Sequence, residues 1–191
     1  MARNAAAGND SRERMLEAAI SLMRGSGLSG AGINEIVRES GAPKGSVYHF
    51  FPDGKLSLAS EALAIYAQRV GSFLDAALSS RKRPEDKVRA LFAAFAKRVR
   101  ESGYRKSCAV GAVSLDLDGD AGRLQPVPAD ALAQWVECIA AHFDFGSTRR
   151  TRAFASLVLT TVEGAYVRCR AERSDRAFAE AGEWLAELAK D

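Results

Sequence analysis

Two short helical segments separated by a four-residue break constrain this chain more than any other feature of its sequence. Apolar residues at 33, 36 and 37 follow helical spacing over a short stretch that ends at Gly41, a residue suited to a left-handed cap. Pro43 can open a new helix at once, because a proline in the first helical turn loses no hydrogen bond. The pattern therefore predicts a helix-turn-helix over about residues 33–52, with its second helix running through Phe50.

Helical periodicity continues along the rest of the chain, and strand-like alternation is nowhere sustained. Gly146 is expected to end one helix, and Ser147 and Ser174 are expected to cap the next two. The predicted class is all-α with roughly nine helices. They are expected at about residues 11–24, 33–41, 43–50, 56–79, 84–99, 109–117, 129–145, 147–172 and 174–188.

Length and composition narrow the class of protein. The 191 residues, 47% hydrophobic and 27% charged, suffice for one ordinary core or for a small module fused to a larger one. No apolar run approaches the roughly 18–20 residues that span a bilayer, and the polar N-terminus lacks the centre of a secretory signal. We expect a cytoplasmic protein with no membrane partner. Cys108, Cys138 and Cys169 form no metal-ligand cluster in the sequence, so neither a metal nor another cofactor is expected.

The second short helix carries chemistry suited to DNA. Val47 and Phe51 are four residues apart and can pack inward, which leaves Lys44, Ser46 and the ring tips of Tyr48 and His49 to face outward. The second helix of a helix-turn-helix lies in the major groove, where such groups donate to phosphates and base edges. The alternative of plain core aromatics is disfavoured by the surrounding spacing.

The segment GLSGAGINEIVRESGAPKGSVYHFFPDGKLSLASEAL resembles the DNA-binding region of the TetR family of bacterial transcriptional regulators. The resemblance implies an N-terminal DNA-binding domain, a larger helical ligand-binding and dimerisation domain, and repression relieved by a small molecule. We assign residues 1–55 to the first domain and 56–191 to the second. The residues expected to contact DNA are Ser29, Asn34, Lys44, Gly45, Ser46, Tyr48, His49 and Lys55.

Three positions depart from the family pattern. Gly32 stands where the family generally has a capping Ser or Thr, and Phe50 stands where a phosphate donor is common. The third departure is the extra residue Gly54 before the lysine, a feature that resembles the branch of lincomycin- and flavonoid-responsive repressors. The segment GYRKSCAVGAVSLDLDGD also resembles that branch. Residues 1–55 contain seven basic and six acidic side chains, so affinity is expected to require a homodimer on a palindromic operator of double-stranded DNA.

The C-terminal region is expected to hold an apolar effector cavity and the dimer interface. An excess of large apolar side chains is typical of such a cavity, although plain core filling gives the same composition. The expected pocket residues are Tyr66, Phe92, Phe95, Trp135, Ile139, Phe143, Val162 and Tyr166. The family places its dimer interface on the last two helices, which implies Phe154, Leu157, Val158, Thr161, Phe178, Trp184, Leu185 and Leu188.

Other functions and sites weigh less. An enzyme would use Cys108 as nucleophile and His142 as base, but no supporting motif accompanies them, and Cys108 as a redox sensor would need a lowered pKa. A binding module without DNA binding is the other alternative. The acidic DLDGD, residues 116–120, departs from a calcium loop and is interpreted as a solvated turn. The sequence leaves open the effector, the operator, the regulated genes and the choice between repression and activation.

Overall fold

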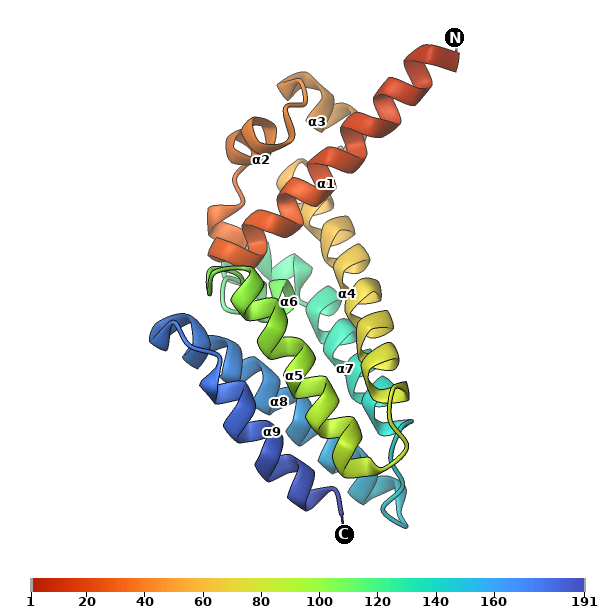
Figure 1. The fold of residues 1–191 in the computed structure, drawn as a ribbon. Coiled ribbons are helices and arrows are strands. Elements are labelled where there is room, and N and C mark those ends of the chain that lie inside the picture. Colours follow the sequence, from red (N-terminus) through yellow and green to blue (C-terminus); the bar gives the residue numbers. More distant parts are fainter. Residues whose placement is uncertain (1, 191) are drawn as a thin grey trace. The chain divides into compact units, whose positions relative to one another are not determined.

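The computed structural model describes residues 2–190, and Figure 1 shows that this part of the chain consists of helices joined by loops. The predicted all-α class is confirmed. The elements are α1 (Ala2–Gly30), α2 (Ile33–Ser40), α3 (Lys44–Phe50), α4 (Lys55–Ser79), α5 (Pro84–Glu101), α6 (Ala109–Ser114), the 3-10 helix η1 (Gly119–Leu124), α7 (Pro126–Ala140), α8 (Thr148–Glu172) and α9 (Arg176–Leu188). No helix of the described residues is long and apolar enough to cross a membrane.

The helices pack into two compact units. The first contains the residues up to Ala67 together with Ala109–Ala129, and the second contains Gln68–Cys108 and the residues from Asp130 onward. Helix α6 therefore packs with the N-terminal helices, although it lies far from them in sequence. The predicted domain boundary between residues 55 and 56 remains a prediction, since compactness alone does not define domains.

The first unit is built around α1, which packs against α2, α3 and α6. Met15, Ala19 and Met23 of α1 are completely buried, as the helical spacing of these residues requires. The chain leaves helical geometry at Ser26 and Gly27 and resumes a helical turn to Gly30. The predicted stop after residue 24 is thus a break, and the short turn beyond it leads into α2.

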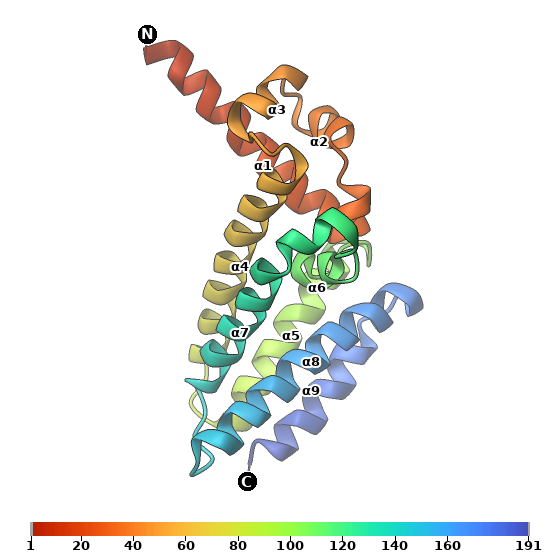
Figure 2. The same ribbon diagram turned by 180° about the vertical axis from the view of Figure 1, so that it is seen from behind.

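The second unit is a bundle in which α9 packs against α5 and α8. Figures 1 and 2 show α8 and α9 side by side from opposite directions. The Ser147 hydroxyl accepts a hydrogen bond from the Arg150 amide at 3.2 Å and caps α8, as predicted. The Ser174 hydroxyl accepts one from the Arg176 amide at 3.2 Å, although Asp175 is the boundary residue of α9.

The predicted helix over 129–145 is wrong at both ends. Helix α7 begins at Pro126, where proline fits the first turn, and ends at Ala140. The rings of Phe143 and Phe145 stack 6.1 Å apart at 5°, and both lie against Phe154. Residues two apart on a helix point to different faces, so these two rings can share a partner only after the helix has ended.

Candidate nucleic-acid interface

The turn between α2 and α3 is held by local hydrogen bonds. Gly41 adopts the left-handed conformation with φ 64°, and its amide donates to Val37 O at 3.0 Å, as the prediction of a glycine cap requires. The Ser40 hydroxyl accepts from the Ala42 amide at 3.2 Å, and the Ser40 carbonyl accepts from Arg14 of α1 at 3.1 Å. The turn is thus fixed both internally and against α1.

Helix α3 is anchored on one side and open on the other. Val47 and Phe51 are completely buried, which confirms the predicted inward pair. The Arg12 guanidinium lies 5.5 Å from the centre of the Phe51 ring and also pairs with Glu61 of α4. A seven-residue helix has little stability of its own, so these contacts hold it in place.

The opposite edge of α3 carries most of the residues predicted to contact DNA. Tyr48 is 58% exposed, and Lys44, Gly45 and His49 are also exposed, whereas Ser46 is half-buried. Tyr48 thus keeps most of a large, hydroxyl-bearing ring in solvent beside two buried anchors. The arrangement leaves a donor-bearing edge available to a partner, and its contacts with DNA remain predictions.

Phe50 and Gly54, two of the departures from the family pattern, both lie next to neighbouring rings in the structure. Phe50 is half-buried, and its ring centre lies 4.9 Å from that of His49 and 6.4 Å from that of Phe51. Gly54 has φ 60°, and a Cβ there would lie 3.3 Å from Tyr48 Cε1. The turn before α4 therefore packs against the Tyr48 ring, and Lys55 follows this turn as the first residue of α4.

Lys55 and Ser29 have carboxylate neighbours that the sequence did not reveal. Ser29 donates to Asp116 Oδ2 from its amide at 2.9 Å and from its hydroxyl at 2.8 Å. Burial lowers the pKa of Lys55, and the charge of Asp116 opposes that shift. Residues 118–120 are exposed, as expected of a solvated turn, and Asp116 in addition accepts these two hydrogen bonds. At the start of α2, Gly32 provides no side-chain cap, and Asn34 is exposed.

The predicted pocket residues fall into separate groups. Tyr66 belongs to the first unit, where Arg24 lies 5.8 Å from its ring centre. In the second unit the Phe95 ring stacks on Phe178 at 5.7 Å and meets Tyr166 edge-on at 5.8 Å. Phe92, Trp135, Ile139 and Val162 are also buried in this unit. The ring of Phe143 instead packs with the rings of Phe145 and Phe154.

Several residues predicted for the dimer interface lie inside their own chain. Val158 is 1% exposed, Phe178 0% and Leu185 4%, so none of them presents a surface to a second copy. Phe154 packs with the rings of Phe143 and Phe145. The assignments of Val158, Phe178 and Leu185 are corrected, because both helices have apolar residues on two faces and the sequence does not say which face is covered. Phe154 is half-buried, and its place in the interface stays a prediction.

The remaining interface residues do lie on the surface. Leu157 and Thr161 of α8 are accessible, and so are Trp184 and Leu188 of α9, with Trp184 76% exposed. Val167, 67% exposed, is another apolar residue on the surface of α8, but it lies about 80° around the helix from Leu157 and so on a different face. Leu157, Thr161, Trp184 and Leu188 form what we call the outer stripe.

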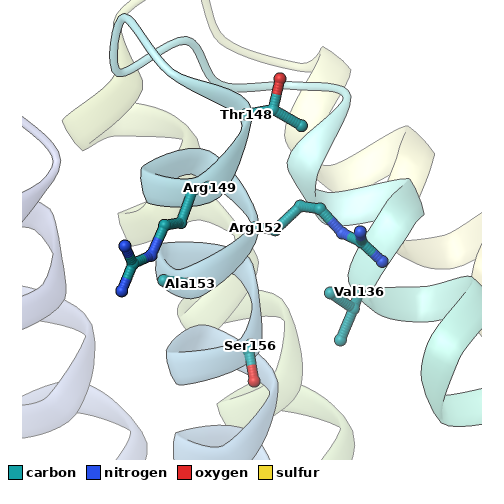
Figure 3. Close-up of a pocket in the computed structure, with 6 residues that line it drawn as sticks. All are labelled: Val136, Thr148, Arg149, Arg152, Ala153 and Ser156. Carbon is teal, nitrogen blue, oxygen red and sulfur yellow. The ribbon is translucent and has the colours of Figure 1, made fainter.

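An open hollow of about 560 Å³ lies between α7 and α8. Figure 3 shows its lining residues, Val136, Thr148, Arg149, Arg152, Ala153 and Ser156, with the two arginines pointing to opposite sides. Arg152 pairs with Glu137 Oε1 at 2.6 Å, so its charge is partly compensated. The shallow, arginine-rich surface differs from the apolar cavity that the sequence predicted for an effector.

Glu163 is the polar residue of the second unit that sequence reasoning missed. Burial raises the pKa of its carboxyl, and a hydrogen bond from Cys108 partly offsets that shift. Its position among small and apolar residues of α8 could have indicated from the sequence that this carboxyl is partly buried. Cys108 is 3% exposed, and His142 instead pairs with Asp75 Oδ1 at 2.9 Å. The proposed nucleophile and base are therefore engaged with different partners.

A buried anchor, a capped turn and an exposed, donor-bearing second helix define a helix-turn-helix DNA-binding regulator. Residues 15–62 match the model of the bacterial regulatory proteins of the tetR family, and residues 84–184 match that of the LmrA/YxaF-like transcriptional regulator C-terminal domain. The chain belongs to the TetR family, in its LmrA/YxaF branch. It is a transcriptional regulator and not an enzyme.

Individual relatives agree with this assignment. An uncharacterized HTH-type transcriptional regulator of Mycobacterium tuberculosis is 31% identical over 169 residues, covering 85% of each chain. LmrA of Bacillus subtilis is 56% identical over 54 residues, which cover 28% of this chain and 29% of LmrA. A regulatory protein TetR from Rhodobacter sphaeroides has the same fold, with TM-score 0.83 and 19% identity over 93% of this chain and 97% of that one.

Proposed function

We propose that the protein binds a palindromic operator as a homodimer and represses transcription until a small apolar or aromatic molecule releases it. The exposed edge of α3 carries the proposal, because Tyr48 stays 58% exposed while Val47 and Phe51 beside it are completely buried. The edge offers Lys44, Ser46, Tyr48 and His49 to DNA, with Lys55 adding a phosphate contact and Ser29, Asn34 and Gly45 lining the approach. In the ordinary geometry of this motif, each copy would read one half-site.

The operator proposal is tested with DNA from the promoter region of the protein's own gene. Fluorescence anisotropy at several salt concentrations should show tighter binding to this DNA than to random DNA of equal length. Tyr48→Ala should abolish the preference while leaving the melting temperature within about 2 °C of wild type, as for a surface substitution. Leu115→Ala is the matched control, since Leu115 is 82% exposed and lies outside the motif. Equal loss of binding and of stability in Tyr48→Ala would make Tyr48 structural.

The outer stripe supports the dimer. Contiguous apolar side chains left in solvent on two packed helices are typical of a protein interface, and an exposed tryptophan is a common hot spot. Trp184→Ala should weaken the dimer by about 30-fold, which corresponds to a loss of about 2 kcal/mol. Analytical ultracentrifugation across protein concentrations would measure the shift. Unchanged association would remove Trp184 from the interface.

The buried rings of the second unit support an apolar or aromatic effector. The rings of Phe92, Phe95 and Tyr166 each pack on that of Phe178. Trp135, Ile139, Phe143 and Val162 add buried apolar surface, and Tyr66 is an additional candidate from the first unit. A ligand favouring a dimer state poorly spaced for adjacent half-sites would lower operator affinity through its differential binding. Lincomycin and a hydroxyflavone serve as probes. Tyr166→Ala should change the concentration at which an active probe releases DNA, and release that is unaltered would place the site elsewhere.

A further inference from the structure

Phe50 lies between a buried ring and an exposed ring at the end of α3. Its ring centre lies 6.4 Å from that of Phe51, which is 0% exposed, and 4.9 Å from that of His49, which is exposed. Both contacts are edge-on, with interplanar angles of 66° and 67°. Phe50 itself is half-buried. The three rings therefore form a row that runs from the interior of the first unit to its surface.

The inner end of this row is fixed by the backbone and by α1. The Phe51 amide donates to Val47 O at 2.7 Å, and the Phe51 carbonyl accepts from the Gly54 amide at 2.8 Å. The Arg12 guanidinium of α1 lies 5.5 Å from the centre of the Phe51 ring. Phe51 is thus held by its backbone and enclosed by packed neighbours, so Phe50 packs on a rigid partner.

The contact between Phe50 and His49 does not follow from helix geometry alone. Side chains one residue apart point about 100° apart around a helix and do not face each other. The two rings meet because both side chains turn toward one another. An exposed histidine without such a neighbour would sample several rotamers, and ordering it on binding would cost affinity. The contact restricts the imidazole before any partner binds.

We propose that Phe50 is a positioning residue that holds the His49 imidazole in one orientation for hydrogen bonding to a base edge of the operator. The inference rests on the proposed function, in which the exposed edge of α3 enters the major groove. The imidazole N–H can donate to the acceptors that guanine, adenine and thymine present there. A phenylalanine ring has no such donor, so Phe50 acts through its neighbour. It increases the selectivity of binding and adds no phosphate contact.

Two substitutions of Phe50 separate the ring from its apolar bulk. Phe50→Leu removes the aromatic edge and keeps an apolar side chain, whereas Phe50→Tyr keeps the ring. Fluorescence anisotropy should show that Phe50→Leu lowers the preference for promoter DNA over random DNA by about three- to tenfold, the cost of ordering one side chain. Its binding to random DNA should stay within about twofold of wild type, because phosphate contacts are unchanged. Phe50→Tyr should keep the wild-type preference.

Phe145→Leu is the matched control for Phe50→Leu. Phe145 is also half-buried and also packs edge-on against a neighbouring ring, that of Phe154, but it lies in the second unit. Its substitution should leave binding to both DNAs within about twofold of wild type. Circular dichroism should show that every variant is folded.

A double-mutant cycle distinguishes positioning from direct contact. His49→Ala should lose at least as much preference for promoter DNA as Phe50→Leu. Adding Phe50→Leu to His49→Ala should cause no further loss, because Phe50 acts through His49. The proposal would be overturned by additive losses, by an unchanged preference in Phe50→Leu, or by an equal loss of binding to random DNA.

The ring contact can also be tested without DNA. The chain contains two histidines, so the imidazole protons of His49 can be assigned in an NMR spectrum by comparison with His49→Ala. The ring current of Phe50 should shift these protons in the wild type and in Phe50→Tyr, and Phe50→Leu should remove the shift. Identical His49 signals in wild type and Phe50→Leu would overturn the inference. A wild-type protein that shows the shift but has no preference for its promoter DNA would instead refute the proposed function.

Discussion

Replacing Gly182 of α9 with alanine should destabilise the second unit, although the same change usually stabilises a helix. An ideal Cβ at Gly182 lies 2.7 Å from Phe92 Cβ and 3.1 Å from Phe92 Cγ on α5. Carbon atoms in contact prefer separations of about 3.5–4.0 Å, so the new methyl would overlap by roughly 0.8 Å or more. Rotating the Phe92 side chain does not move its Cβ, so the backbones of α5 and α9 would have to separate.

The magnitude follows from two opposing effects. Gly→Ala in a helix interior gains about 0.5–1 kcal/mol when there is space. Overpacking a close-packed interior costs about 1–3 kcal/mol. Phe92 is 1% exposed, and its ring centre lies 6.2 Å from that of Phe178, so it has no free space to enter. The cost of overpacking should exceed the gain in helix propensity, so the free energy of unfolding should fall by about 1–2 kcal/mol.

Urea unfolding followed by circular dichroism, at one protomer concentration, measures this change. Gly71→Ala is the matched control: Gly71 also lies inside a long helix, α4, but nothing lies within 4 Å of its added Cβ. That variant should be more stable than wild type by about 0.5–1 kcal/mol. If Gly182→Ala had the same free energy of unfolding as wild type, or a higher one as expected for Gly71→Ala, the close approach of α5 and α9 at Gly182 would not limit stability.

Two further substitutions test the buried carboxyl and the break in α1. Burial raises the pKa of Glu163 in the folded state. The folded protein therefore loses stability as the pH rises from the ordinary pKa of a glutamate through the pKa of Glu163 in the folded state. Glu163→Gln should therefore be more stable than wild type at pH 8, and the difference should narrow toward pH 4 in urea titrations; a pH-independent difference would contradict this. Gly27→Ala should lower the free energy of unfolding by about 1–3 kcal/mol through backbone strain and displacement of Asp116. Wild-type stability of Gly27→Ala would show that the strained geometry is not required.

Local sequence signals predicted the recognition segment well. The conformation of Gly41, the burial of Val47 and Phe51 and the Ser147 cap all depend on interactions within a few residues. Such interactions are set by backbone chemistry and helical spacing, which can be read from adjacent letters. The end of α7 was mispredicted for the opposite reason, since it depends on the packing of Phe143 and Phe145 against a helix further along the chain.

The sequence by itself determined the helical class, the helix-turn-helix and the family of this protein. Only the tertiary structure decided which apolar face of α8 and α9 is covered, so that Phe178 lies inside and Trp184 outside. Only the tertiary structure brought Asp116 to Ser29, 87 residues away in the chain. The physical reason is that helical periodicity reports the faces of one helix, whereas burial and charge depend on which other helix packs against each face.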